Sequence, residues 1–136
     1  MMAGYSGKPL GEKLGIKKEF TIVLVNPPKQ YMTLVAPLPE GVTIAAKITN
    51  KTDLVHLFTT SKAELSKMLR STLTKIKQDA IIWVSWPKKS SNVPTDITED
   101  RIRDIALPLG LVDIKVCAVD EVWSGLKLVI RKENRK

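Results

Sequence analysis

Histidine and cysteine are almost absent from this chain of 136 residues, which contains one of each, His56 and Cys117. A single cysteine excludes an intrachain disulfide, and a single histidine excludes a metal site built on several imidazoles. Cys117 lies in an apolar run, where a free cysteine usually acts as a small hydrophobic residue. We therefore expect a reducing compartment and no metal centre.

Long apolar runs are also absent. No segment approaches the roughly 20 residues that a membrane helix needs, and the N-terminal residues lack the apolar stretch of about 7–15 residues typical of a signal peptide. We therefore expect a cytoplasmic protein without a membrane segment. The length and the 43% hydrophobic content predict one domain, 1–136. Within it we expect an N-terminal arm with a short helix (1–19) and a basic tail (133–136).

Negative charge is scarce, because 14 acidic residues face 22 lysines and arginines, which gives a net charge of +8. This excess favours anionic partners and says nothing about the fold. The helix expected over residues 61–77 is especially basic, with Glu64 as its one acidic residue. No zinc-finger, RNP or helix-turn-helix signature accompanies it. A solvated basic face is the simpler interpretation, and a basic nucleic-acid-binding module is an alternative.

Apolar periodicity indicates strands that alternate with helices. Glycine-poor β-branched runs such as "FTIVLV" predict strands buried on both faces. Ser61 with Glu64, and Asp96 with Glu99 or Thr98 alone, are typical helix caps. The expected strands are 20–25, 42–46, 53–58, 80–86, 111–119 and 126–132, and the expected helices are 9–15, a short one ending near 36, 61–77 and one through 107.

This order predicts an α/β fold: a Rossmann-like, mostly parallel sheet with helices on both faces and a C-terminal antiparallel β-hairpin. One connection is too short for a helix, since only "KITNKT" joins the second and third strands. The second strand therefore either runs antiparallel or is followed by a bare crossover, and the sequence leaves its direction open.

The segments "DLVHLF" and "DAIIWVSW", each followed by a helix, and the final hairpin resemble a truncated, degenerate class I methyltransferase fold. The resemblance implies S-adenosylmethionine, a glycine-rich turn after the first strand and an acidic residue after the second. Here the first turn is "NPPKQY", without glycine, and the second strand ends in Ala46 and Lys47. We therefore expect no cofactor and no active methyltransferase.

A second resemblance rests on "GYSGKPLGEKLGIK", "WVSWPKK" and "LPLGLVDIKVCAVDEVWSGLKLVIRK". These segments are similar to a small bacterial family of unknown function. The resemblance implies an intact domain and no particular reaction. "GYSGKP" itself does not match a phosphate-binding loop, because proline replaces Ser/Thr and no strand precedes it.

Ligands of open α/β sheets bind at the carboxyl ends of parallel strands. If the strands at 80–86 and 111–119 run in the same direction, the loops after them meet there. Two indoles could then hold a flat or apolar group and two lysines an anion. The candidate binding residues are Asn26, Trp86, Lys88, Lys89, Ser90, Asp120, Glu121 and Trp123.

Each candidate has a plainer interpretation. The tryptophans could only cover the sheet edge, and Lys88 and Lys89 could pair with Asp120 and Glu121 at the surface. His56 is the one side chain whose ordinary pKa suits proton transfer near neutrality, but a strand histidine is more often a core hydrogen-bonding residue.

The sequence thus favours a non-catalytic, methyltransferase-like domain that binds an unknown protein or a small anionic ligand. A small enzyme that uses the same cleft, with His56 or Asp120 as base, is a second hypothesis. Nucleic-acid binding is the third.

Overall fold

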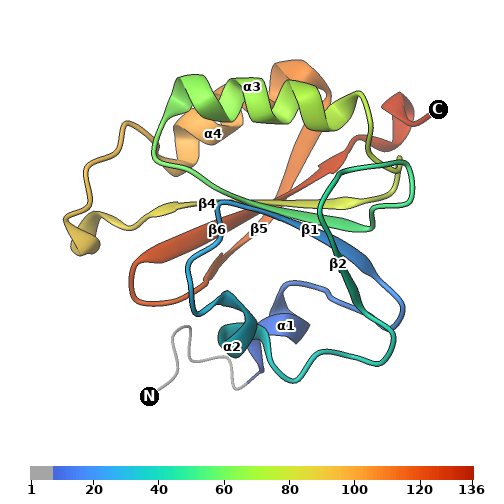
Figure 1. The fold of residues 1–136 in the computed structure, drawn as a ribbon. Coiled ribbons are helices and arrows are strands. Elements are labelled where there is room, and N and C mark those ends of the chain that lie inside the picture. Colours follow the sequence, from blue (N-terminus) through green and yellow to red (C-terminus); the bar gives the residue numbers. More distant parts are fainter. Residues whose placement is uncertain (1–7) are drawn as a thin grey trace.

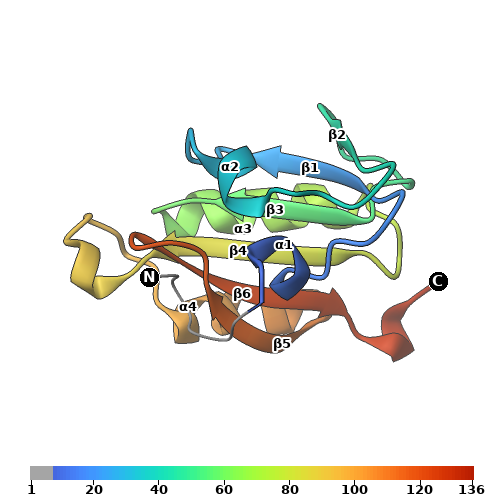
Figure 2. The ribbon, with the colours of Figure 1, turned by 90° about the horizontal axis from the view of Figure 1, so that it is seen from below.

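Within residues 8–136, which the structure describes, six strands form a sheet of order β2-β1-β3-β4-β6-β5 with helices on both faces (Figures 1 and 2). The structure is a computed structural model. The strands are β1 Thr21–Val25, β2 Thr43–Ala45, β3 Leu54–Phe58, β4 Ile81–Pro87, β5 Leu111–Ala118 and β6 Trp123–Ile130. The α-helices are α1 Leu10–Lys13, α2 Tyr31–Val35, α3 Lys62–Leu73 and α4 Glu99–Ala106, and the 3-10 helices are η1 Lys89–Ser91, η2 Leu107–Leu109 and η3 Lys132–Asn134.

The central strands are buried on both sides, which explains their continuous apolar sequences. In β3, Val55 and Leu57 point to the side covered by α3 and α4, which we call the α3/α4 face. Leu54 and Phe58 point to the opposite side, the α1/α2 face, where they pack with Tyr31 of α2. The predicted α/β architecture with helices on both faces is confirmed.

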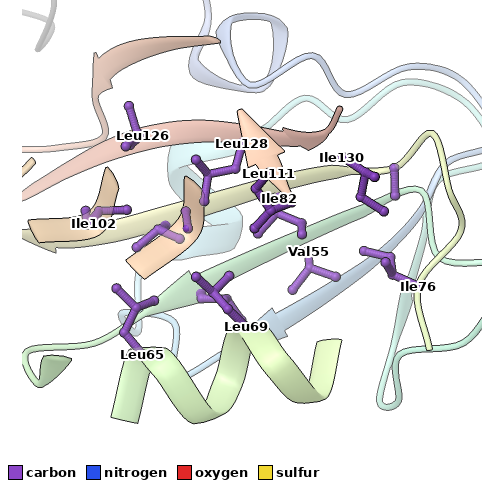
Figure 3. Close-up of a cluster of buried hydrophobic side chains, with 14 of the residues drawn as sticks. Val55, Leu65, Leu69, Ile76, Ile82, Ile102, Leu111, Leu126, Leu128 and Ile130 are labelled. Carbon is purple, nitrogen blue, oxygen red and sulfur yellow. The ribbon is translucent and has the colours of Figure 1, made fainter. Parts of the chain in front are cut away.

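An apolar core closes the α3/α4 face (Figure 3). Leu65 and Leu69 of α3 and Ile102 of α4 are fully buried, and they pack over Ile82 and Leu128 of the sheet. Burying a side chain of this size contributes about 1.5–3 kcal/mol. This core anchors the layer of helices that Figure 1 shows above the sheet.

Two predicted helix starts are confirmed in part. The Ser61 hydroxyl accepts a hydrogen bond from the Glu64 N–H (3.2 Å) at the start of α3, and Thr98 caps α4 by accepting from the Arg101 N–H (3.2 Å). Asp96 does not cap α4. Its carboxylate accepts from the Lys62 N–H (2.8 Å) and so ties the loop before α4 to the first turn of α3.

The second strand is parallel to its neighbour, since β2 pairs with β1 in a register that places Thr43 opposite Thr21. The chain then returns to the start of β3 through a bare crossover over residues 46–53, one of the two alternatives that the sequence left open. Thr52 is fully buried in this crossover, and its hydroxyl accepts from the Thr49 N–H (2.9 Å). Ile48 packs against the core of the α3/α4 face.

The final hairpin places β6 between β4 and β5. Because β6 is antiparallel to both, β4 and β5 run in the same direction, as the candidate site required. The turn between β5 and β6 is shorter than expected, and β6 begins at Trp123. The Asp120 carboxylate closes it by accepting from the N–H groups of Val122 (2.8 Å) and Trp123 (2.7 Å).

The N-terminal arm packs on the α1/α2 face. The buried indole of Trp83 in β4 donates a hydrogen bond to the Leu14 carbonyl (2.8 Å), and Leu14 itself is fully buried. The helix α1 is shorter than the predicted 9–15, and Gly15 (φ 84°) supplies the left-handed conformation after it. Residues 1–7 of the predicted arm, which include the first part of "GYSGKP", lie outside the described residues.

Candidate functional site

A cleft of about 610 Å³ opens on the α1/α2 face, between α1, α2 and the β5–β6 turn. Its walls are largely apolar, with Leu10 of α1, Leu34 of α2 and Val122 of the turn. Lys8, Lys13 and Gln30 add polar groups at its rim, as do Asp120 and Glu121. Small-molecule sites are commonly concave, mostly apolar and of about 300–1,000 Å³, with few polar groups.

A smaller hollow of about 370 Å³ continues the cleft along β5. The two share Lys8, Lys13 and Ala118, and the hollow adds Glu12 of α1 and Lys115, Val116 and Cys117 of β5. Burial raises the pKa of the Cys117 thiol, although the nearby Lys13 and Lys115 act in the opposite direction. The thiol is therefore protonated at neutral pH and is a weak nucleophile.

Asp120 fixes the shape of the cleft. One carboxylate oxygen holds the β5–β6 turn, and the other accepts a hydrogen bond from Gln30 Nε2 (3.1 Å) just before α2. The turn and α2 are 90 residues apart in sequence, so this contact joins two walls of the cleft. Asp120 was predicted as a site residue and lies in the cleft, together with Glu121.

The two tryptophans of the predicted site do not face one another. Trp86 belongs to the core of the α3/α4 face and is only 8% exposed. Trp123 lies on the α1/α2 face, where its ring meets Phe58 edge-on at 5.1 Å. Trp123 pairs with Pro87 rather than with Trp86, and successive strand residues point to opposite faces. The expectation that two indoles grip one ligand is therefore wrong.

The backbones of the two predicted loops do meet, since the Lys88 N–H donates to the Val122 carbonyl (2.7 Å). The side chains of Lys88, Lys89 and Ser90 do not line the cleft. Within the described part of the chain, neither lysine forms an ion pair with Asp120 or Glu121. Lys89 and Ser90 instead belong to η1, which projects away from the body of the domain (Figure 1).

Asn26 also lies outside the cleft. It follows β1 with a left-handed backbone (φ 55°), and its Nδ2 lies 3.5 Å from the Phe58 carbonyl at the end of β3. This contact links two adjacent parallel strands at their carboxyl ends, so a structural role accounts for the residue.

His56 is fully buried on the α1/α2 face. Its Nδ1 lies 2.9 Å from the Tyr31 hydroxyl and its Nε2 lies 2.7 Å from the Ser85 hydroxyl. Burial lowers the pKa of His56 to about 3 and raises that of Tyr31. Both ring nitrogens are occupied, and the residue does not line the cleft. It is a core hydrogen-bonding residue, and the hypothesis that it is a general base of the cleft is wrong.

The basic helix α3 lies on the far side of the sheet from the cleft (Figure 1). Beyond the end of this helix, Lys77 pairs with Asp53 (2.8 Å), which in turn accepts from the Thr21 N–H. Lys67, Arg70 and Lys75 are exposed on or just after the helix. These charges cannot serve the cleft, and nucleic-acid binding by α3 stays a separate prediction.

The turns after β1 and β2 do not fit S-adenosylmethionine. Pro27 and Pro28 supply no N–H groups, and the N–H of Tyr31 donates to the Pro28 carbonyl (3.0 Å) instead of facing a ligand. The end of β2 offers Ala45, Ala46 and Lys47 in place of a carboxylate for ribose hydroxyls. The cleft lies beside α1 rather than at these turns. We therefore derive no chemistry that uses this cofactor.

Sequence reasoning missed the residues that the N-terminal arm contributes, namely Lys8, Leu10 and Lys13, and also missed Leu34 and Lys115. The position of the arm depends on the hydrogen bond between Trp83 and Leu14, a contact across 69 residues that no local pattern reveals. The available signal was the buried-strand tryptophan itself, because a buried indole N–H usually requires a partner.

Among residues 8–136, no group of three or more His, Cys, Asp or Glu side chains is arranged to hold a metal ion. Over the same residues, no helix combines the length and apolar character needed to cross a membrane.

Several solved structures of similar fold are methyltransferases. A SAM-dependent methyltransferase from Aquifex aeolicus shares 13% identity (TM-score 0.61, 88% of this chain and 87% of that one). A candidate type 11 methyltransferase from Sulfolobus solfataricus shares 12% (TM-score 0.61, 98% and 96%). A SAM-dependent O-methyltransferase from Thermotoga maritima shares 8% (TM-score 0.59, 90% and 64%). At such identities the likeness shows the Rossmann-like methyltransferase fold and not an activity.

No curated protein gave a significant match to the sequence. The profile of one protein family matches residues 42–132, which is well over half of the chain and includes β2 to β6. The arm and α2, which form one side of the cleft, precede the matched region. The chain belongs to this family, a family of proteins of unknown function (DUF3052).

Proposed function

We propose that this domain is a non-catalytic binding protein whose ligand is a small molecule with an apolar body and an anionic group. The observation that carries the proposal is the cleft of about 610 Å³ between α1, α2 and the β5–β6 turn. Leu10, Leu34 and Val122 give it apolar walls, which favour a ligand body that leaves water. Lysines at one end supply the attraction for an anion.

The arrangement favours binding over catalysis. Asp120 is the half-buried carboxylate of the turn that borders the cleft, and its two oxygens already accept three hydrogen bonds. The Cys117 thiol is protonated, and His56 is enclosed by Tyr31 and Ser85. A base that is committed to holding the turn cannot move toward a substrate without opening the cleft.

Calorimetric titration with naphthalene-2-sulfonate tests the proposal, because this anion combines a flat apolar body with one negative charge. We expect saturable binding to the wild type and at least a tenfold loss of affinity in Leu34→Glu, which places a carboxylate on the apolar wall (an effect of about 1.4 kcal/mol or more).

The matched control is Leu73→Glu. Leu73 is also a partly buried leucine at the edge of a core, but it lies on the α3/α4 face. We expect this variant to bind the probe as the wild type does, provided that both variants unfold cooperatively. Equal affinity of Leu34→Glu and wild type would refute the site.

A further inference from the structure

We propose that the lysine-lined end of the cleft binds the phosphate group of a phosphorylated small molecule, whose apolar part lies between α1 and α2. The inference rests on the proposed function and specifies its ligand class.

The first observation is that the cleft and the smaller hollow are continuous. The cleft and the smaller hollow share Lys8, Lys13 and Ala118, so a ligand in the first extends naturally into the second. The hollow lies between α1 and the outer part of β5, with Lys115 on its wall and Glu12 as its acidic residue. A ligand that spans both spaces would have its apolar body at Leu34 and its end group near Lys115.

The second observation is a group of lysines from three segments, of which Lys115 lines the hollow. Lys115 of β5 and Lys127 of β6 are directly opposite one another in the strand register. Lys17, just after α1, also acts electrostatically on Lys127, whose pKa is lowered by partial burial and by the charges of Lys115 and Lys17. None of the ion pairs within residues 8–136 involves these three lysines.

Like charges on directly opposed strand residues are destabilising. A bound anion removes this repulsion, and a phosphate monoester does so best among common groups, because it carries about −1.5 to −2 charges near pH 7 and several acceptor oxygens. Lysine ammonium groups bind phosphate as point charges and can adjust their positions around it. The cluster therefore favours a dianion over a carboxylate or a sulfonate.

The acidic end of the cleft determines which way a phosphorylated ligand binds. Asp120 and Glu121 border it there, and the Asp120 carboxylate faces Gln30. A phosphate at that end would meet like charge, whereas a phosphate near Lys115 meets opposite charge. One cleft thus presents an acidic end, apolar walls and a basic end, and a ligand with one phosphate has one favoured direction.

The test compares three probes with the same apolar body: 2-naphthol, naphthalene-2-sulfonate and 2-naphthyl phosphate. Affinity is measured by calorimetry at pH 7.5 and constant ionic strength, with amide chemical shifts to locate each probe. We expect affinity to increase in that order, with the phosphate at least about tenfold tighter than the naphthol. Lys115→Gln and Lys127→Gln should each remove most of this advantage.

Lys67→Gln is the matched control, because Lys67 is exposed on α3 and its substitution changes the net charge equally. It should retain the preference for the phosphate. Equal affinities for naphthalene-2-sulfonate and 2-naphthyl phosphate, both tighter than for 2-naphthol and with shifts in the cleft, would overturn this inference and leave the proposed function intact. Absence of shifts in the cleft with all three probes would overturn both.

Discussion

The two faces of the sheet are built in different ways. The α3/α4 face is covered by two regular helices over an apolar core that includes Leu65, Leu69 and Ile102. The α1/α2 face is covered by two helices of one turn each, encloses the polar chain of Tyr31, His56 and Ser85, and leaves a cleft at its edge. We infer that the α3/α4 face mainly supplies stability, and we propose that the α1/α2 face supplies the binding site.

The difference between the two faces can be tested by truncating one leucine on each of them. Leu69→Ala removes a fully buried side chain of the α3/α4 core and should cost about 2–5 kcal/mol of unfolding free energy. Leu34→Ala, in the half-buried wall of the cleft, should cost clearly less. Urea denaturation measures both, and equal losses would contradict the division between a stabilising and a binding face.

The buried His56 should make the unfolding free energy depend on pH. Because its folded pKa of about 3 lies below the ordinary value of 6.5, the native state binds fewer protons than the unfolded state between these values. The contribution of neutral His56 is fully present above pH 6.5 and is lost as the pH falls toward 3. We expect about 2 kcal/mol of lost stability between pH 7 and pH 5.

The control for this prediction is His56→Gln, which has no titrating ring. Its stability at pH 7 will differ from that of the wild type, so the comparison is between slopes of unfolding free energy against pH. The slope of the variant between pH 7 and pH 5 should be flatter. Parallel slopes would show that His56 does not stay neutral in the folded protein.

Attachment of the N-terminal arm can be tested at Trp83. Trp83→Phe keeps most of the buried aromatic surface but leaves the Leu14 carbonyl without its indole donor. We expect the unfolding free energy to fall by about 1–3 kcal/mol. Relative to the wild type, amide hydrogen exchange should accelerate more in residues 10–16 than in α3. Unchanged exchange in the arm would mean that other contacts hold it on the sheet.

The smallest expected effect is a stabilisation. Replacing Lys115 by Thr removes one of two opposed positive charges on β5 and β6 and should raise the unfolding free energy by roughly 0.5 kcal/mol at low salt. The gain should shrink as salt screens the repulsion. Thermal unfolding at two salt concentrations measures it, and a destabilisation at low salt would argue against a repulsive cluster.

Most strands of the sheet could be predicted because the sequence patterns that specify them are local. The two-sided apolar runs of β3 and β4, and the caps at Ser61 and Thr98, all appear within a few residues of the features that they specify. The direction of β2 could not be read, since a bare crossover held by Thr49 and Thr52 has no periodic pattern.

The candidate site was predicted less well. The strand direction correctly predicted that the two loops meet, as the Lys88–Val122 hydrogen bond shows, and it placed Asp120 and Glu121 near one another. The pairing of Trp86 with Trp123 failed because strand alternation sends their rings to opposite faces, and the register that decides this depends on where the tight turn at Asp120 ends. The contribution of α1 depends on a tertiary hydrogen bond and has no local signature.

We propose above that the cleft between α1, α2 and the β5–β6 turn binds a small anionic ligand. Amide chemical shift mapping of the wild-type protein with 2-naphthyl phosphate tests it most directly. If the ligand binds there, the largest shifts should lie in residues 10–13, 30–34 and 115–122. Shifts confined to residues 86–91 or to α3, or an absence of saturable shifts, would contradict it.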